Sequence, residues 1–278
     1  MNKNWFITGA GSGIGTGIAK AALRAGDHVV ATGRNLDKVR NALRDVASEN
    51  LAFVQLGVAD ETQAKAAVQE AVDKFGRIDV AVNNAGYSLL GNFEEMSLPE
   101  LERQLATNFY GVVHVMRAVL PVMRKQRAGR IVNISSLGGV IGFKHCAAYS
   151  ASKFALEGLS LSVAAEVERF GIKITLVEPG FFRTDLLDAA NAKWPSATIE
   201  DYADETKPRD MWSAYDGTQQ GDPAKLGEAL VTIAGMTNPP KQFYAGSDAI
   251  AAIRPALEAR LQEIKDYEAL STSTDGSY

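Results

Sequence analysis

Short runs rich in β-branched residues alternate with longer helical patterns along most of the 278-residue chain. Strands joined by helical crossovers pair in parallel, so the alternation predicts an α/β fold with helices on both faces of the sheet. The pattern therefore predicts one doubly wound parallel sheet of about seven strands. The strands are predicted near residues 4–8, 28–32, 51–56, 78–82, 129–134, 172–177 and 242–245.

Composition and charge exclude several classes of function. Cys146 is the only cysteine, which rules out an internal disulfide framework and fits a reducing compartment. The first residues pass directly into a predicted strand without a signal-peptide pattern, and no apolar run approaches about eighteen residues. We therefore expect a cytoplasmic protein without a membrane partner. The formal net charge of -4 argues against a nucleic-acid partner.

A glycine-rich turn, Thr8-Gly-Ala-Gly-Ser-Gly-Ile-Gly15, lies between the first predicted strand and a helix that should begin near Gly13. Glycines let the backbone approach a pyrophosphate, and the helix N-terminus offers unpaired N–H groups to it. The turn therefore predicts a dinucleotide phosphate site. Its spacing departs from G-x-G-x-x-G, and an ordinary strand-to-helix turn without ligand remains an alternative.

The end of the second predicted strand indicates which dinucleotide is bound. An NAD site usually carries an acid there for the adenosine ribose, but this chain reads Thr32-Gly-Arg34-Asn35. A planar guanidinium at Arg34 can pair with a ribose 2′-phosphate. The sequence therefore favours NADP(H) over NAD(H), with a solvated loop charge as the alternative reading of Arg34.

Tyr149 and Lys153 are four residues apart on a predicted helix, with Ser136 upstream. Residues at that spacing share a helix face, so the phenol and the ammonium can reach one bound molecule as a proton donor and its activator. A free phenol titrates near about 10, and a cation at about 4 Å would lower its pKa toward neutrality. The alternative is an amphipathic pair at a helix edge.

Taken in order and spacing, several motifs resemble those of the short-chain dehydrogenase/reductase family from the first strand to about residue 250. They are Thr8-Gly-x3-Gly13-x-Gly15, Asn83-Asn-Ala-Gly86, Asn108, Ser136, Tyr149-x3-Lys153 and Pro179-Gly180. The resemblance implies a Rossmann-type single domain over residues 1–250. It also implies reversible hydride transfer between a nicotinamide and a carbonyl or alcohol, the chemistry of a carbonyl reductase or alcohol dehydrogenase.

The same resemblance implies roles for four catalytic residues. Tyr149 is the general acid in reduction and the base in oxidation. Lys153 also binds the nicotinamide ribose, Ser136 stabilises the substrate oxygen, and Asn108 holds a water that connects Lys153 to solvent. Two alternatives stay open: Asn108 bonding only backbone, and Ser136 capping a loop.

Cofactor contacts are likewise implied by the resemblance. One departure is Gly57, where many relatives carry an aspartate near the adenine; Asp60 is expected to cap the next helix instead. The expected contacts are Gly9, Ser12, Gly13, Ile14, Arg34, Val58, Asn84, Ala85, Gly86, Tyr149, Lys153, Pro179, Gly180, Phe182 and Thr184.

Residues 181–221 form an unusually long connection rich in aromatic residues, which we interpret as a lid over the substrate, the lid segment. Mostly apolar walls suit a ketone or secondary alcohol with a bulky hydrocarbon body. Packing of the lid aromatics on the sheet is the alternative. The expected substrate contacts are Ser136, Leu90, Val140, Phe143, His145 and Tyr149, with Leu89 beside them.

A different class of function is a regulator that senses NADP(H) without turnover, although a sensor does not require a proton relay. By family analogy we expect a homodimer or homotetramer that pairs through the helices near 98–126 and 147–170. Residues 251–278 are expected to form a C-terminal helical extension with a frayed tail.

Overall fold

The computed structural model describes residues 2–188, 192–203 and 207–276 of the chain. Its seven strands form one parallel sheet in the order β3-β2-β1-β4-β5-β6-β7, which confirms the predicted fold class. The order reverses between β1 and β4, as in Rossmann-type doubly wound sheets, where ligands bind at the carboxyl ends of the strands. The strands are β1 (Asn4–Ile7), β2 (His28–Gly33), β3 (Leu51–Gln55), β4 (Val80–Asn83), β5 (Gly129–Ile134), β6 (Ile172–Pro179) and β7 (Gln242–Ala245).

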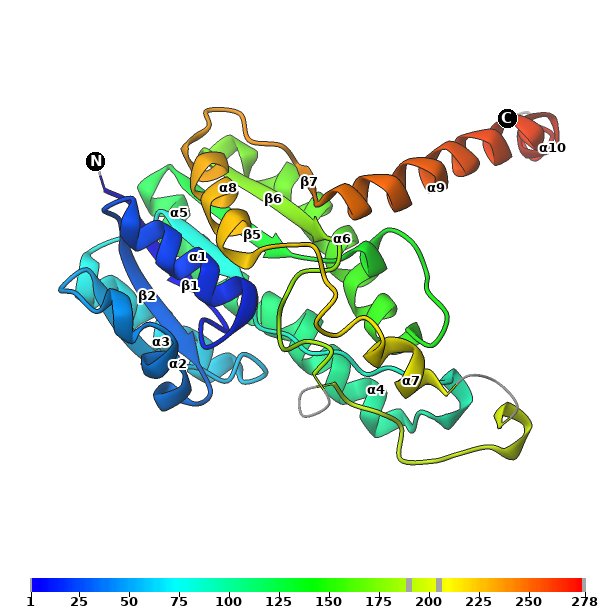
Figure 1. Ribbon diagram of the computed structural model, residues 1–278. Helices are drawn as coiled ribbons and strands as arrows, with labels where there is room; N and C mark the ends of the chain where they lie inside the picture. Colours follow the sequence, from blue (N-terminus) through cyan, green and yellow to red (C-terminus); the bar gives the residue numbers. More distant parts are fainter. Residues whose placement is uncertain (1, 189–191, 204–206, 277–278) are drawn as a thin grey trace.

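Helices cover both faces of this sheet (Figure 1). α1 and α8 pack on one face with Trp5 and Ile7 of β1, while α3, α5 and α6 pack on the other with Phe6. Successive side chains of β1 thus point into two different hydrophobic cores, as expected for a sheet buried on both sides. The helices are α1 (Gly13–Arg24), α2 (Leu36–Ala42), α3 (Glu61–Phe75), α4 (Leu98–Leu105), α5 (Gly111–Gln126), α6 (Ala147–Val167), α7 (Pro208–Ser213), α8 (Pro223–Gly235), α9 (Ser247–Asp266) and α10 (Glu268–Thr272).

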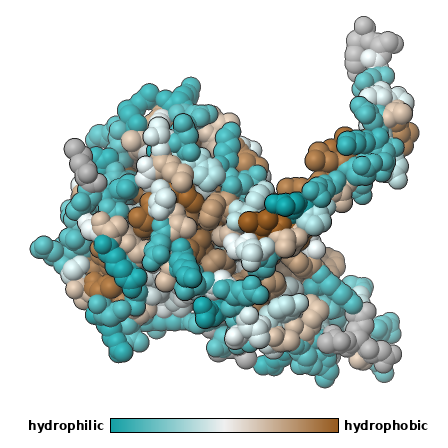
Figure 2. Space-filling model, turned by 45° about the horizontal axis from the view of Figure 1, so that its top comes forward, coloured by the Kyte–Doolittle hydropathy of each residue, from teal (hydrophilic) through white to brown (hydrophobic). Residues whose placement is uncertain are grey.

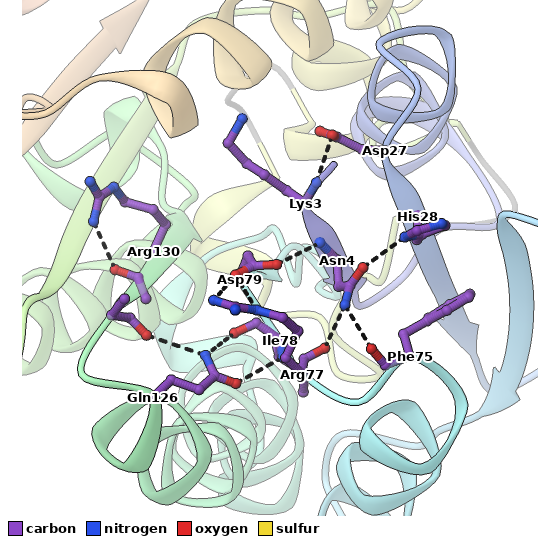
Figure 3. Close-up of polar contacts among 12 residues, drawn as sticks. Lys3, Asn4, Asp27, His28, Phe75, Arg77, Ile78, Asp79, Gln126 and Arg130 are labelled. Carbon is purple, nitrogen blue, oxygen red and sulfur yellow. Dashed lines mark hydrogen bonds and ion pairs between the residues drawn. The ribbon is translucent and has the colours of Figure 1, made fainter. Parts of the chain in front are cut away.

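The amino edge of the sheet is fastened by side chains that bond to backbone (Figure 3). Asn4 Nδ2 donates to the carbonyls of Phe75 and Arg77 at 3.0 and 3.2 Å, at the end of α3. Gln126, the last residue of α5, bonds both the N–H and the C=O of Ile78. Because the N–H and C=O of Ile78 bond the side chain of Gln126 and not a neighbouring strand, β4 begins at Val80 rather than at the predicted residue 78.

One stretch of helix, Leu98–Gln126, is long and apolar enough by length and composition to cross a membrane. Its apolar character has an explanation in the fold. Val112, Val115, Met116, Val119 and Met123 of α5 are buried in the core that the sheet shares with α3 and α6. A core helix of this kind passes the same test.

The C-terminal extension begins earlier than predicted, because α9 starts at Ser247. Its first turns pack Ala249 and Ile253 against Leu137 and Val140. The helix then leaves the body of the molecule and projects outward (Figure 1). Apolar side chains gather at its base and along its outer part (Figure 2), and Leu261 and Ile264 there are exposed. Residues 277–278 of the predicted frayed tail lie outside the described residues.

Candidate active site

A cavity of about 1010 Å³ opens at the carboxyl ends of β1, β2, β4, β5 and β6. Both the predicted phosphate turn and the predicted catalytic residues contribute to its walls. All fifteen expected cofactor contacts lie in this lining: Gly9, Ser12, Gly13, Ile14, Arg34, Val58, Asn84, Ala85, Gly86, Tyr149, Lys153, Pro179, Gly180, Phe182 and Thr184.

The glycine turn has backbone angles and close approaches that require glycine. Gly9 has φ +65°, and a Cβ there would lie 2.9 Å from Ala85 Cα. Gly13 has φ +52° and begins α1, as predicted; a Cβ there would lie 2.9 Å from Thr184 Cγ2. The first N–H groups of α1 therefore face the cavity beside bare backbone, an arrangement that fits a bound pyrophosphate.

Thr8 and Asn84 join the turn to the end of β4. Thr8 Oγ1 accepts hydrogen bonds from the N–H groups of Asn84 and Ala85 at 2.9 and 3.1 Å. In return, Asn84 Nδ2 donates to the carbonyls of Thr8 and Gly9, both at 3.0 Å. The Asn83-Asn-Ala-Gly86 motif thus holds the glycine turn in place.

Two cations of the cavity wall follow β2 in the chain, and a third comes from α4. Arg34 follows β2 directly, and Lys38 on α2 and Arg103 on α4 line the same cavity. Lys38 Nζ also lies 3.7 Å from Asp185 Oδ2, so its charge is partly compensated. Three cations and the absence of an acid after β2 fit a phosphorylated ribose better than free hydroxyls.

The predicted helix cap at Asp60 is present, since Asp60 Oδ1 accepts from the N–H groups of Thr62 and Gln63 at 2.8 and 3.1 Å. These bonds hold the pKa of Asp60 below its usual value, with the N–H of Gln63 as the largest cause. Gly57 N–H donates to Gln63 Oε1 at 2.9 Å. The side chain of Gln63 therefore lies beside Gly57 in the cavity wall, at the position where the family resemblance implied an aspartate.

The phenol of Tyr149 and the hydroxyl of Ser136 lie within hydrogen-bonding reach of each other. Tyr149 and Lys153 are buried on one face of α6, with exposed fractions of 9% and 6%. Lys153 Nζ donates to the carbonyl of Ile134 at 2.8 Å and lies 5.6 Å from the centroid of the Tyr149 ring. Ser136 also accepts from Gly138 N–H at 3.1 Å, so the capping alternative for Ser136 holds beside its place next to Tyr149.

Burial has opposite consequences for these two titratable groups. It raises the pKa of Tyr149, and the hydrogen bond to Ser136 only partly opposes that rise. It lowers the pKa of Lys153 to about 8, against the opposing effect of Glu157. Lys153 was expected to lower the pKa of the Tyr149 phenol. In this arrangement it does not, because its ammonium donates to Ile134 O and the burial of the phenol has the larger effect on its pKa.

Asn108 lies in a π-helical turn, Ala106–Tyr110, between α4 and α5. Its Nδ2 donates to the carbonyl of Tyr87 at 2.9 Å and to Ser152 Oγ at 3.2 Å, while its Oδ1 accepts from the Tyr87 N–H. Both side-chain N–H groups are thus used, and Asn108 is not among the described residues that line the cavity. The alternative in which Asn108 bonds only backbone is met in part, because it bonds the backbone of Tyr87 in another loop and also the Ser152 hydroxyl.

The end of the cavity near Tyr149 is mostly apolar. Leu89, Leu90 and Phe143 line it as predicted. Two expected contacts do not line it. Val140 packs instead against the base of α9, and His145 is buried with φ +60°, its carbonyl accepting from Gly91 N–H at 2.8 Å. Both lie on the loop before α6, whose path the sequence pattern does not reveal.

Aromatic residues of the lid segment reach the same apolar end. Trp212 is buried in one cluster with Leu90, Cys146 and Tyr149. Phe181 stacks on Tyr215 with ring centroids 4.8 Å apart, and Trp212 lies 6.4 Å from Phe143. The lid aromatics therefore pack on the substrate end of the cavity rather than on the sheet alone. Residues 189–191 and 204–206 of this segment lie outside the described residues.

Backbone contacts hold the lid segment over the cavity. Leu90 N–H donates to Lys193 O at 2.9 Å, and Gly221 N–H donates to Phe181 O at 2.9 Å. At the start of the segment, Phe181 N–H donates to Asp248 Oδ2 at 2.7 Å, while a Cβ on Gly180 would collide with that carboxylate. Gly180 is thus required for the close approach of Asp248 at the start of α9.

Cys146 is buried beside Tyr149. Burial raises the pKa of the Cys146 thiol to about 11, so it acts as an apolar wall. Among residues 2–188, 192–203 and 207–276, no group of three or more His, Cys, Asp or Glu side chains is placed to hold a metal ion.

Comparison with known proteins finds many relatives. Residues 3–194 match the family model described as short chain dehydrogenase. Oxidoreductase BOA17 of Botryotinia fuckeliana is 36% identical over 99% of this chain and 100% of its own length. A 3-ketodihydrosphingosine reductase of Bacteroides thetaiotaomicron is 41% identical over 87% of each chain.

Solved structures with the same architecture include two informative neighbours. A short-chain dehydrogenase from Streptomyces avermitilis aligns with a TM-score of 0.89 at 35% identity, covering 99% of this chain and 100% of that one. The protein ElxO, solved with NADP bound, aligns with a TM-score of 0.72 at 32% identity over 87% of this chain and 96% of its own.

Proposed function

The chain belongs to the short-chain dehydrogenase family, and from that premise we propose that it is an NADP(H)-dependent reductase of ketones or aldehydes, running in reverse as an alcohol dehydrogenase. The single observation that carries the proposal is the placement of Ser136, Tyr149 and Lys153 in one cavity with the glycine turn. A bound nicotinamide would supply the hydride. The chain's own residues then have to bind the carbonyl and move one proton.

In the reduction, Ser136 and Tyr149 hold the substrate oxygen by hydrogen bonds, and Tyr149 donates its phenolic proton to that oxygen as charge develops. Its raised pKa keeps the phenol protonated, which suits a proton donor. In the oxidation the phenol must first ionise, which requires the Lys153 ammonium to turn from Ile134 O toward the ring. The buried setting excludes water from the proton transfer.

The preference for NADP(H) over NAD(H) is supported by Arg34 and Lys38, which follow β2 and line the cavity. A guanidinium after β2 can pair with a 2′-phosphate in a bidentate way, and no acid stands there to bind free ribose hydroxyls. ElxO, with NADP bound, has the same architecture at 32% identity.

The side chain of Asn108 is occupied by hydrogen bonds to Tyr87 and Ser152. Any catalytic contribution of Asn108 would therefore come from the backbone of its π-helical turn.

For the substrate we propose a carbonyl compound with a hydrophobic body. The wall beside Tyr149 is made by Leu90, Phe143 and Trp212. Apolar contacts of this kind position a hydrocarbon or aromatic body and leave specificity to the few polar groups. One relative is named as a reductase of a keto compound, 3-ketodihydrosphingosine.

A substrate screen tests this proposal. Consumption of NADPH is followed with apolar ketones of increasing length and with small polar sugars. We expect kcat/KM to rise with apolar body size and to stay low for the sugars. A preference for sugars would contradict the assignment of the pocket, and failure to consume NADPH with every carbonyl would favour a sensor of NADP(H).

Homo-oligomeric assembly and a cytoplasmic location complete the proposal. Phe154 and Leu161 lie seven residues apart on the outer face of α6 and are 41% and 43% exposed, which suits a subunit interface. The single buried cysteine fits a reducing compartment. Light scattering on the purified protein tests the first point, with a homodimer or homotetramer expected.

A further inference from the structure

A cluster of buried polar side chains lies beneath the catalytic cavity, on the face of α6 that carries Tyr149 and Lys153. Glu157 comes one helical turn after Lys153 on that face and is only 7% exposed. Glu178, at the end of β6, is completely buried. Neither carboxyl group lines the cavity or has a part in the proton transfer proposed above.

Gln242 of β7 connects the two carboxyl groups. Its Nε2 lies 3.4 Å from Glu157 Oε2 and 3.2 Å from Glu178 Oε1. Glu178 Oε2 accepts from the N–H of Phe243 at 3.0 Å. Both carboxyl groups are therefore held by the strand that closes the sheet. Both carboxyl groups are buried, whereas Gln242 itself is exposed, so the cluster lies just beneath the surface at β7.

The cluster contains one cation and two acids, and burial decides how many of them are charged. Two carboxylates with one ammonium would leave a net negative charge in the interior, which is costly. Burial and the charge of Glu157 raise the pKa of Glu178 to about 8. Burial also raises the pKa of Glu157, while Lys153 opposes that rise. Glu157 lies one helical turn from the Lys153 ammonium, whereas Glu178 is completely buried on β6, so the position favours the negative charge on Glu157.

We propose that Glu157 is a positioning residue for carbonyl reduction: its carboxylate keeps Lys153 in the ammonium form, while Glu178 stays protonated and leaves the cluster electrically neutral. This inference rests on the proposed function of Tyr149 and Lys153. Lys153 makes its hydrogen bond to Ile134 O, so Glu157 acts on it through space, along the helix, and not as a ligand of the substrate.

The effect on chemistry follows from the position of the Lys153 titration. Burial lowers the pKa of Lys153 to about 8 even with the opposing charge of Glu157. Removing that charge lowers the pKa further, and each unit lost reduces the ratio of ammonium to amine about tenfold. A loss of one unit would leave about half of Lys153 as a neutral amine at pH 7, and that form cannot stabilise negative charge on Tyr149.

Other titratable groups around Glu157 need to be separated from this coupling. Tyr244 faces both carboxyl groups from β7, and they raise its pKa together with burial. Tyr149 lies two turns away on α6, and its pKa responds to burial, Ser136 and Cys146. Gln242 and Ser135 are polar neighbours that do not titrate. Lys153 and Glu178 are therefore the groups whose titration reports the charge of Glu157 near neutral pH.

The direct test measures the titration of Lys153 by NMR in protein carrying ¹³C-labelled lysine, with the signal assigned by its absence in Lys153→Met. Three variants are compared with the unmodified protein: Glu157→Gln, Glu157→Asp and Glu178→Gln. We expect Glu157→Gln to lower the Lys153 pKa by about one unit or more. Glu157→Asp retains the charge and should restore most of the value. Glu178→Gln should change it much less, because the charge that acts on Lys153 is that of Glu157 and Glu178 stays largely protonated below its own pKa of about 8.

Kinetics give a second readout that a merely structural role would not move. In Glu157→Gln, the alkaline limb of kcat/KM for ketone reduction should shift to lower pH by the same amount as the Lys153 titration. An unchanged Lys153 titration in Glu157→Gln, or an equal shift in Glu178→Gln, overturns the proposal. If Glu157→Gln does not fold, the comparison of Glu157→Asp with Glu178→Gln decides, since a Lys153 pKa that falls by one unit in Glu178→Gln and not at all in Glu157→Asp would assign the charge to Glu178. The NMR test needs no substrate, so it stands apart from failure of the reductase assay.

Discussion

Replacing Arg34 by alanine should separate the two nicotinamide dinucleotides. Arg34 follows β2 directly and lines the cavity beside Lys38 and Arg103. Hydrogen bonds to a charged group contribute about 1.5–3 kcal/mol, which corresponds to roughly a 10- to 150-fold change in affinity. Because Arg34 is exposed, screening by solvent and salt places the expected loss of NADPH affinity in the lower part of that range, about 10- to 30-fold.

Affinities for NADPH and NADH are measured by fluorescence titration of the unmodified protein and of Arg34→Ala. The matched control is Arg40→Ala, since Arg40 lies on α2 over the Phe53 ring, pairs with Asp37 and does not line the cavity. We expect NADH affinity to change less than about twofold in both variants, because only NADPH carries the phosphate. Equal weakening of both dinucleotides by Arg34→Ala, or no weakening of either, would refute the role given to Arg34.

Three further perturbations test the packing, the buried acid and the substrate wall. Gly17→Ala places a Cβ 2.2 Å from Pro223 O and should lower the free energy of unfolding in urea by about 1–3 kcal/mol. The control Gly158→Ala meets nothing within 4 Å and should be neutral or slightly stabilising. Equal effects of the two variants would contradict the close contact between α1 and α8. Because the folded protein raises the pKa of Glu178 to about 8, the free energy of unfolding should fall as pH rises from about 5 to 8, by up to about 1.4 kcal/mol per pH unit. Glu178→Gln should abolish that fall. Stability curves that run parallel for the two proteins would contradict a raised pKa for Glu178. Trp212→Ala should raise KM for a bulky ketone about tenfold through lost apolar contact without changing NADPH affinity, and the reverse pattern would remove Trp212 from the substrate wall.

The sheet could be predicted from the sequence because its strands are buried on both faces. Their apolar runs stand out from the helices without any knowledge of their partners. The boundaries that differ have identifiable tertiary causes. β4 loses Ile78 to the side chain of Gln126, and β6 runs on to Pro179 because β7 pairs with it as far as Ala245.

The glycine turn and the residues that line the cavity were also accessible to sequence reasoning, since local backbone requirements leave a mark in residue type. Lys38 was missed, although it lies one turn after the start of α2, close to Arg34. Its position at the cavity depends on how α2 packs. The position of Val140 away from the cavity likewise depends on its packing against α9.

The cluster of Glu157 and Glu178 shows the limit of sequence reasoning more clearly. In the sequence, Glu157 belongs to an ordinary helix and Glu178 to the end of a strand. Only the pairing of β7 with β6 brings Gln242 between them and removes both from water. Asn108 is similar, because its hydrogen bonds to Tyr87 depend on the π-helical turn.

The central claim is that Tyr149 donates the proton in an NADPH-dependent reduction. It is tested most directly by comparing the unmodified protein with Tyr149→Phe, measuring NADPH binding and NADPH consumption with apolar ketones in the same preparations. We expect both proteins to bind NADPH with similar affinity and Tyr149→Phe to lose at least about 100-fold in kcat, as expected when a general acid is removed. Equal consumption of NADPH by both proteins, or binding without consumption in either, would contradict the account.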